Sequence, residues 1–425
     1  MRKYSTEKRI LKENRQKETF VHLIENLVHC GKTPARYIIR REPGCKPPQR
    51  PGGNFNERIF MLKVGLIGCG NISSIYLKNA PVFAKQIMLT SCADLRRESA
   101  ENRASQYGIK ACSVEEILAD PEIAIILNLT TPQSHAEINL RALEAGKHVY
   151  CEKPFSLDRE SAQKVLAKAK ETGLRTGCAP DTFLGGGHQQ SRRLIDSGLI
   201  GKVIAGSAFM LCHGHESWHP APGFYYQKGG GPLFDMGPYY ITALINVLGP
   251  IREVTAMTTR STDLRKGIKV NEGKTFPVEI DTHISAILRF EQGAVISLIT
   301  SFDVWKHSIN CAIEYYGTEG SLAEPDPNSF SGNIRFFRAG LTSNWSDADN
   351  AFIYNDNTRI LGLADMAAAI EEKRPHRASG ELAYHVLDVM CSILDSAESG
   401  KTAAVKSTCC RPEPLASGLK EGEIK

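Results

Sequence analysis

The sequence predicts an α/β protein in which a doubly wound parallel sheet is followed by a region with a mainly antiparallel sheet. Two observations carry this prediction. Short apolar runs alternate with helical stretches over residues 62–178, which is typical of a parallel sheet covered by helices on both faces. After residue 250, strand-like runs follow one another across short turns such as residues 291–293, which join antiparallel neighbours.

In the first half, strands are expected at residues 62–67, 87–93, 123–129, 148–151 and 175–178, and helices at 72–80, 96–107, 135–145 and 158–172. The continuous apolar run at 123–129 is expected for a strand buried on both faces. We predict that residues 61–181 form one domain.

In the second half, helices are expected at residues 189–196, 238–248, 363–372 and 382–396, and strands at 203–212, 253–260, 282–290, 294–302 and 310–316. The mixture predicts an α+β domain over residues 182–407, followed by a tail at 408–425.

Composition places the chain among ordinary globular proteins, with 42% hydrophobic and 23% charged residues in 425. We find no apolar run of the roughly 18 residues that a transmembrane helix needs, and the N-terminus lacks the apolar stretch of a secretion signal. Twelve scattered cysteines without a C-x-x-C pair favour a reducing compartment, so we predict a cytoplasmic protein without membrane contact.

The net charge of +5 comes from residues 1–60, which contain 14 Lys and Arg against 6 Asp and Glu. The remainder is slightly acidic, which argues against a nucleic-acid partner. Residues 1–30 fit an amphipathic helix and residues 34–55 a Pro/Gly-rich linker. This leader is either a targeting or binding arm, or a disordered tail or upstream start, because Met61 directly precedes the first strand.

A glycine pattern follows the first strand. Gly68, Gly70 and Ser73 match G-x-G-x-x-(small) between a predicted strand and helix, the context in which this pattern binds a dinucleotide. Gly68 permits the tight turn, Gly70 lets the backbone approach a pyrophosphate, and Ser73 is small enough for close packing. We predict a Rossmann nucleotide-binding fold.

Asp94 ends the second strand, where a ribose-binding acid belongs. Its carboxylate would accept from both ribose hydroxyls and repel a 2′-phosphate, which favours NAD. Arg96 and Arg97 follow directly and could instead bind that phosphate, so NADP stays open.

Two further motifs stand at predicted strand ends, where open α/β sheets form their ligand crevice. They are the stretch from Asn128 to His135 (NLTTPQSH) and the triplet from Glu152 to Pro154 (EKP). Together with the glycine pattern and the run from Cys178 to Asp181 (CAPD), they resemble the glucose–fructose oxidoreductase/inositol dehydrogenase/rhizopine-catabolism family. The resemblance extends from about Met61 to Ser407.

The resemblance implies an NAD(P)-dependent oxidoreductase acting on a hydroxyl of a sugar, inositol or glycoside. It also implies a C-terminal domain built on a large open sheet that binds substrate and forms a homodimer or homotetramer. We expect the cofactor to be contacted by Gly68, Gly70, Asn71, Ile72, Ser73, Asp94, Arg96, Thr131, Pro132, His135, Glu152 and Lys153.

Lys153 is implied by the resemblance to contact the reacting oxygen. An alcohol must lose its O–H proton as a hydride leaves carbon. A partly desolvated lysine beside oxidised nicotinamide should have a lowered pKa and could serve as base or proton relay.

The family's second catalytic element is usually Asp-x-Gly-x-His, directed at the substrate. This chain has Asp235 and Gly237, but Tyr239 occupies the histidine position. A phenol donates well but is a poorer base at neutral pH, so the departure shifts the acid–base role to Lys153. We predict substrate contacts from Lys153, Asp181, Trp218, His219, Asp235 and Tyr239.

The run from His215 to His219 spells H-E-x-x-H, a zinc-protease motif that requires a regular helix. Gly214 before it and Pro220 and Pro222 after it would break such a helix, and no third ligand is evident. We therefore predict no metal and a polar, aromatic loop that contacts sugar. A non-catalytic dinucleotide-binding regulator remains the alternative, against which Lys153 and Asp235 argue.

Overall fold

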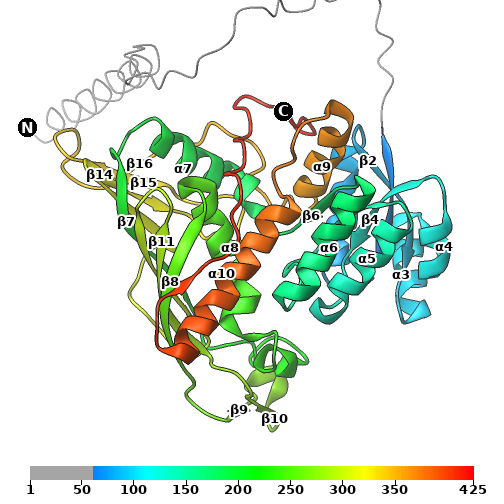
Figure 1. Ribbon diagram of the computed structural model, residues 1–425, viewed down its shortest axis with the longest axis horizontal. Coiled ribbons are helices and arrows are strands. Elements are labelled where there is room, and N and C mark those ends of the chain that lie inside the picture. The colour runs from blue at the N-terminus through cyan, green and yellow to red at the C-terminus, as the bar shows by residue number, and fades with distance from the viewer. Residues whose placement is uncertain (1–60) are drawn as a thin grey trace, which may run out of the picture. The chain divides into compact units, whose positions relative to one another are not determined.

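The computed structural model describes residues 61–425 (Figure 1). The predicted leader, with its helix at residues 1–30 and its linker, lies outside the described residues. Within residues 61–425, none of the helices is both long and apolar enough to span a bilayer.

A six-stranded parallel sheet begins the described chain, in the order β3-β2-β1-β4-β5-β6. Its strands are β1 (Leu62–Ile67), β2 (Ile87–Ala93), β3 (Lys110–Ala111), β4 (Ile123–Asn128), β5 (His148–Cys151) and β6 (Thr176–Cys178). The accompanying helices are α2 (Ser73–Asn79), α3 (Arg97–Tyr107), α4 (Val114–Ala119), α5 (His135–Glu144) and α6 (Arg159–Thr172). The strand order reverses between β1 and β4, which places the loops after these two strands side by side, as in nucleotide-binding sheets.

A nine-stranded sheet forms the second half, in the order β16-β15-β14-β13-β7-β12-β11-β8-β17. The strands are β7 (Val203–Leu211), β8 (Ile251–Thr259), β11 (His283–Phe290), β12 (Val295–Ser301), β13 (Ile313–Gly317), β14 (Gly320–Glu324), β15 (Arg335–Arg338), β16 (Ser346–Asp347) and β17 (Ala403–Ala404). All neighbours pair antiparallel except β7 and β12, which are parallel. The predicted fold class is confirmed.

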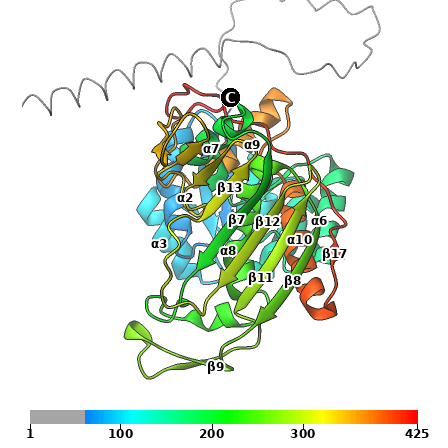
Figure 2. The same cartoon turned by 90° about the vertical axis from the view of Figure 1, so that its left-hand side faces the viewer.

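Within residues 61–425, helices cover one face of the large sheet and leave the other face bare (Figure 2). They are α7 (Gly186–Asp196), α8 (Gly231–Leu248) and α10 (Gly380–Ser399). Helix α9 (Leu361–Glu372) packs against β6 of the parallel sheet. Nearly every side chain of α8 is buried, because it is apolar around its whole circumference. Helix α10 packs against β8 and also against α6, so it joins the two sheets.

A small lobe extends from the edge of the large sheet. It contains the 3₁₀ turn η4 (Pro222–Tyr226) and the hairpin β9 (Leu264–Lys266) and β10 (Thr275–Pro277). We call residues 213–227 and 264–277 the aromatic lobe. Arg265, 3% exposed, fixes the lobe by pairing with Glu216, with Asp303 at 2.6 Å and with the carbonyl oxygen of Phe302 at 2.7 Å.

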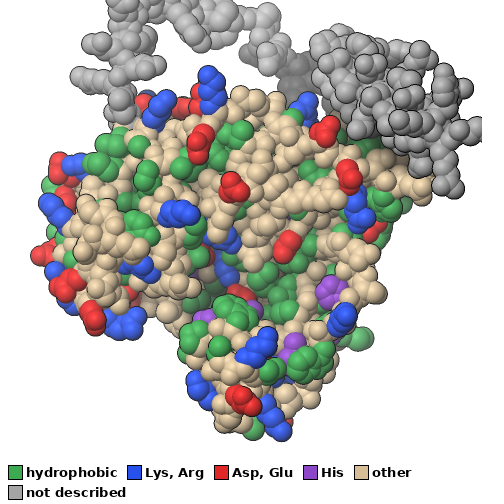
Figure 3. Space-filling model, turned by 180° about the vertical axis from the view of Figure 1, so that it is seen from behind, with side chains coloured by type: hydrophobic (Ala, Val, Ile, Leu, Met, Phe, Trp, Pro, Cys, Tyr) green, Lys and Arg blue, Asp and Glu red, His purple; other side chains and the backbone are tan. Residues whose placement is uncertain are grey.

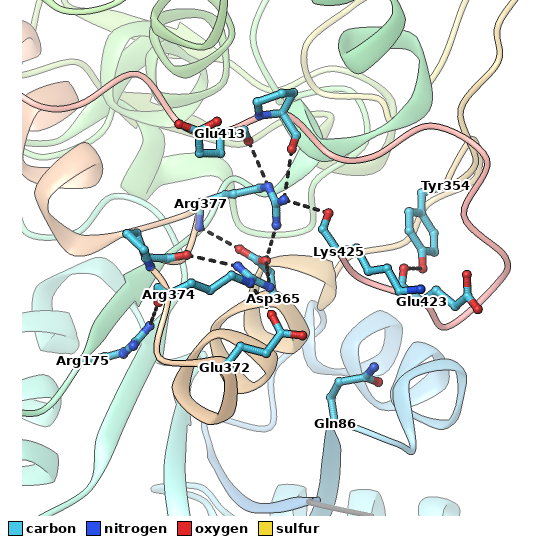
Figure 4. A network of polar contacts seen from close by, with 12 residues as sticks. Gln86, Arg175, Tyr354, Asp365, Glu372, Arg374, Arg377, Glu413, Glu423 and Lys425 are labelled. Carbon is cyan, nitrogen blue, oxygen red and sulfur yellow. Dashed lines mark hydrogen bonds and ion pairs between the residues drawn. The ribbon is translucent and has the colours of Figure 1, made fainter. Parts of the chain in front are cut away.

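The last residues pack onto the body (Figure 4). Arg377 pairs with Asp365 and donates to the carbonyl oxygens of Glu413, Pro414 and Lys425 at 2.9–3.0 Å. Leu415, Leu419 and Ile424 are buried. Gln86, just before β2, donates to the carbonyl of Gly422 at 3.2 Å. The segment at 408–425 therefore connects the parallel sheet with residues of the second half.

Most predicted elements agree with the structure to within one to three residues, and α8 is the main exception. We expected a helix from residue 238, but α8 begins at Gly231 and includes Pro238 in its interior. Proline is common in the first turn of a helix, which predicted the start at Pro238, but it is Pro232 that lies in the first turn of α8. The short elements β3, α4, β9, β10 and β14 to β17 were not predicted, because their few residues carry no clear period.

Candidate active site

The loop after β1 has the geometry that a dinucleotide requires. Gly68 has a φ of +102°, and a Cβ added there would lie 2.5 Å from the backbone of Leu129 after β4. Gly70 differs, because an added Cβ would meet nothing within 4 Å. Ser73 is fully buried and its hydroxyl donates to the carbonyl of Gly70 at 2.6 Å. The turn is tightly held on one side and open on the other, which fits a pyrophosphate against Gly70.

Asp94 lies at this loop with its carboxylate fixed. Oδ2 accepts from the backbone N–H of Cys69 at 2.7 Å, and Oδ1 accepts from that of Arg96 at 2.9 Å. Each oxygen keeps a lone pair for a ribose hydroxyl. Arg97 is directed elsewhere, to Glu101 at 2.9 Å and the carbonyl of Ala111 at 3.1 Å.

Arg103 of α3 reaches the loop as well, donating to Ser73 Oγ at 3.1 Å and to the carbonyl of Gly70 at 3.4 Å. Arg103 was not predicted from the sequence. Its spacing in α3 carries no motif, and only the fold places it at the glycine turn. Asn71 and Ile72 are exposed beside the turn, as are Gly70 and Arg96.

The two motif-bearing loops after β4 and β5 are joined by His135. Its ring nitrogens lie 2.7 Å from the carbonyl oxygen of Pro154 and 3.1 Å from that of Thr130. The side chain is 1% exposed, and burial lowers its pKa despite these two acceptors. We predicted a cofactor contact for His135, but the structure gives it the role of holding the loops together. Thr131 and Pro132 remain accessible.

Glu152 and Lys153 follow β5, and Lys153 enters an ion pair with α8. Lys153 Nζ lies 2.9 Å from Oδ1 of Asp235 and 2.6 Å from the backbone oxygen of the same residue. Their side chains are 15% and 16% exposed. Glu152 is held behind the pair, because it accepts from the hydroxyl of buried Tyr76 at 2.8 Å. The peptide bond between Lys153 and Pro154 is cis.

The ion pair raises the pKa of Lys153. Burial alone would lower the pKa of Lys153, but the carboxylate of Asp235 outweighs it, so the pKa is raised above its ordinary value. Burial likewise works to raise the pKa of Asp235, yet the charge of Lys153 and a hydrogen bond from His215 hold it below its ordinary value. The pair therefore favours Lys153 as an ammonium donor, while a lowered lysine pKa beside oxidised nicotinamide stays a prediction.

Tyr239 lies one helical turn after Asp235 on α8, and its ring lies beneath Lys153 Nζ at 5.1 Å from the centroid. The guanidinium carbon of Arg359 lies 6.0 Å from the same centroid. Burial works to lower the pKa of Arg359. Tyr239 outweighs this through its electrostatic interaction and a hydrogen bond, so the pKa of Arg359 is raised overall. Arg359 is a second basic side chain at the site, which the sequence did not indicate because it lies in an irregular segment before α9.

The H-E-x-x-H run lies in the aromatic lobe and does not form a helix. His215 faces Asp235, with Nε2 3.0 Å from Oδ2, whereas the neighbouring Glu216 faces Arg265. His219 Nδ1 accepts from the backbone of Ala221 at 3.1 Å. The two histidines thus serve different partners. Among residues 61–425, His, Cys, Asp and Glu side chains do not gather in a group of three or more suited to a metal ion.

Aromatic side chains surround His215 and extend outwards. Its ring contacts those of Tyr225 at 4.0 Å and Trp218 at 5.2 Å, and His219 contacts Trp218 at 5.4 Å. Trp218 is 57% exposed and Phe224 46%. In Figure 3, histidine and hydrophobic side chains gather on the aromatic lobe, next to a hollow in which basic side chains lie.

Asp181 has a different place from the substrate contact that we predicted. It is 1% exposed, and its Oδ2 accepts from the backbone N–H groups of Ile360 and Gly362 at 3.0 Å each, at the start of α9. Burial raises its pKa to about 6, although these N–H groups work against the rise. The carboxylate stabilises the N-terminus of α9 and does not line the site.

Comparison with known proteins identifies the family. Residues 62–179 match the oxidoreductase family with an NAD-binding Rossmann fold, and residues 188–323 match the C-terminal domain of the GFO/IDH/MocA proteins. The chain belongs to the GFO/IDH/MocA oxidoreductase family. As a member of this family, it is an enzyme with a nicotinamide-dinucleotide-binding domain.

Relatives extend over most of the chain. A 1,5-anhydro-D-fructose reductase from Ensifer adhaerens is 25% identical, covering 82% of this chain and 99% of its own. A myo-inositol 2-dehydrogenase from Thermotoga maritima is 22% identical, covering 69% and 82%. A levoglucosan dehydrogenase solved with NADH shares the fold with a TM-score of 0.69 at 23% identity, covering 82% of this chain and all of that one.

Proposed function

We propose that this enzyme transfers a hydride between NAD(H) and a CH–OH or carbonyl carbon of a sugar, inositol or glycoside. The single observation that supports it most is the buried pair of Lys153 and Asp235, which stands at a strand end of the parallel sheet whose glycine loop fits a dinucleotide. The relatives named above act, by name, on an anhydro sugar, an inositol and levoglucosan.

The residues of the chain would divide the work as follows. The glycine loop would hold the pyrophosphate, and Asp94 the ribose hydroxyls. The bound nicotinamide supplies the hydride acceptor or donor. Lys153, charged at neutral pH, would donate a hydrogen bond to the reacting oxygen. In carbonyl reduction it would pass a proton to that oxygen as negative charge develops. In alcohol oxidation, the fraction of Lys153 present as the neutral amine would take the hydroxyl proton as the hydride leaves carbon.

NAD is proposed over NADP because of the charge at the ribose position. The carboxylate of Asp94 faces that position, held by two backbone N–H groups, and would repel a 2′-phosphate. Arg97, one candidate for binding such a phosphate, is committed to Glu101 and the Ala111 carbonyl. Of the two predicted candidates, only Arg96 is then left to bind a 2′-phosphate.

The substrate would lie between the ion pair and the aromatic lobe. An exposed indole such as Trp218 stacks against the apolar face of a sugar ring while polar neighbours, among them His219 and Tyr239, bind its hydroxyls. Trp218→Ala should therefore raise KM by about tenfold for a glycoside, the loss of one stacked ring. Trp345→Ala removes another indole, 40% exposed, that contacts Arg335, and should leave KM unchanged.

A substrate panel tests the function. Purified full-length protein is mixed with sugars, inositols and glycosides in the presence of NAD or NADP, and nicotinamide absorbance is followed. Steady turnover of at least one polyol supports the proposal. A protein that binds NADH but turns over none of them in either direction would favour the non-catalytic regulator instead.

A homodimer or homotetramer is part of the proposal. The uncovered face of the nine-stranded sheet carries apolar side chains, with Met257 81% exposed and Ile287 45% exposed on neighbouring strands. Such a face usually marks an interface. Light scattering on the wild type and on Met257→Glu would show dimers or tetramers that the charge weakens, or a monomer throughout, which would refute it.

A further inference from the structure

His215 holds the carboxylate oxygen of Asp235 that Lys153 leaves free. Its Nε2 lies 3.0 Å from Oδ2, and Lys153 Nζ lies 2.9 Å from Oδ1. Because the carboxylate beside the Lys153 ammonium is ionised, it can only accept, and the imidazole must be the donor. Each oxygen of Asp235 therefore has its own donor, one from the loop after β5 and one from the aromatic lobe.

The surroundings of His215 keep its ring in this position. The ring lies 4.0 Å from that of Tyr225 and 4.8 Å from that of Phe302, and the residue is 8% exposed. Its backbone N–H donates to the hydroxyl of Tyr226 at 3.4 Å. The next residue, Glu216, is clamped by Arg265. A swing of the imidazole away from Asp235 would break several buried contacts at once.

Tyr239 stands where an imidazole partner for Asp235 is usual, and His215 provides that imidazole from another segment. The position that usually carries histidine, four residues after the aspartate on α8, carries a phenol whose ring lies beneath Lys153. The imidazole reaches Asp235 instead from the lobe, 20 residues earlier in the chain. The carboxylate thus keeps an imidazole partner although α8 itself provides none next to it.

We propose that His215 is a positioning residue for the reaction under "Proposed function", on which this inference rests. Its Nε2–H donates to Oδ2 and fixes the carboxylate of Asp235, so that Oδ1 stays on Lys153. Lys153 is thereby held in one position relative to the reacting oxygen.

Several elements packed around the imidazole of His215 carry titratable groups. These are Asp235 on α8 with Lys153 beyond it, Arg265 on β9, Asp303 after β12, and Glu216 and His219 on the segment of His215 itself. The turn η4 adds the phenols Tyr225 and Tyr226. Glu216 and Asp303 are both paired with Arg265. Asp235 is therefore the carboxylate in direct contact with the ring.

The kinetic test compares two substitutions of His215. His215→Gln keeps an N–H donor for Oδ2, whereas His215→Phe keeps a ring and removes the donor. In carbonyl reduction at pH 8, His215→Gln should keep kcat within about threefold, and His215→Phe should lose roughly tenfold or more in kcat, as expected for one hydrogen bond to a charged group.

His213→Gln is the matched control, since His213 stacks on Trp305 at 3.3 Å in the same segment and its replacement should leave the carboxylate of Asp235 in place. Wild-type kcat in His215→Phe, or a loss in His215→Gln as large as that in His215→Phe, would overturn the proposal. A crystal structure of each variant tests it without turnover. His215→Phe should show the carboxylate of Asp235 turned away from Lys153, and His215→Gln should not. An unmoved carboxylate in His215→Phe would overturn the positioning role even if no sugar proves to be a substrate.

Discussion

Replacing Asp235 by asparagine should change both the stability of the protein and its dependence on pH. The carboxylate raises the pKa of Lys153, so in the wild type this lysine stabilises the fold at every pH below its unfolded pKa of about 10.4. That contribution is lost only as the pH rises through the higher folded pKa. In Asp235→Asn the carboxylate charge is gone while the burial remains, so the pKa of Lys153 should fall below its ordinary value.

The size of the effect follows from the burial of the pair. Both side chains are about one-sixth exposed, at 15% and 16%, so solvent screens them little. Removing one partner of such a pair costs about 3–5 kcal/mol. Deprotonation of Lys153 recovers part of this at pH 7, about 1.4 kcal/mol for each unit by which its folded pKa lies below 7. A net loss of about 2–4 kcal/mol in the free energy of unfolding is expected at pH 7.

Urea unfolding at pH 7 and pH 9.5 measures both effects. Between the lowered folded pKa and about 10.4, the unfolded variant binds more protons than the folded one, so its stability should rise with pH relative to the wild type. The deficit of Asp235→Asn should therefore shrink at pH 9.5. The matched control is Glu160→Gln, which breaks an exposed pair with Lys164 and should change nothing. A deficit equal at both pH values, or absent at pH 7, would refute the account of the ion pair.

Two further predictions concern the cofactor. Gly70→Ala should keep its melting temperature but lose at least tenfold in NADH affinity by fluorescence titration, because the added methyl projects into the open side of the loop. Gly68→Ala should instead lose roughly 1–3 kcal/mol of stability, because its φ is +102° and the methyl meets the backbone of Leu129. Equal stability of the two variants would contradict this. Asp94→Ser should relax discrimination against NADP by more than about tenfold in kcat/KM, the effect of removing one repelling charge near the 2′-phosphate, and a wild-type preference for NADP would show that Arg96 governs the site.

The sequence predicted the fold well because its signals are local. The first five residues of β4, at 123–127, are all apolar, and the glycine pattern stands between β1 and α2, so composition and motif agree with the fold. The predicted start of α8 is seven residues late. Proline favours the first turn of a helix, so the sequence indicated a start at Pro238, whereas α8 begins at Gly231 and buries nearly all of its side chains. The packing of residues 408–425 depends on Arg377, whose partners lie far along the chain.

The candidate site was only partly predictable, because contacts between distant residues carry no sequence pattern. Lys153 and Asp235 were each predicted, but their direct contact, 82 residues apart, and the raised lysine pKa that follows from it were not. His215 was dismissed with the zinc motif, although a histidine missing at position 239 could have prompted a search for another. Asp181 was placed at the substrate because it stands in a matching motif, while its buried contacts serve α9.

The central claim is that Lys153 acts on the reacting oxygen of a bound sugar. The most direct measurement is kcat of Lys153→Met together with its NADH dissociation constant, because methionine keeps the approximate length and removes the ammonium. The account predicts that kcat falls by about 10²-fold or more, the range of a positioned acid–base group, while NADH affinity stays within a few-fold. A variant that turns over sugar at the wild-type rate would contradict it.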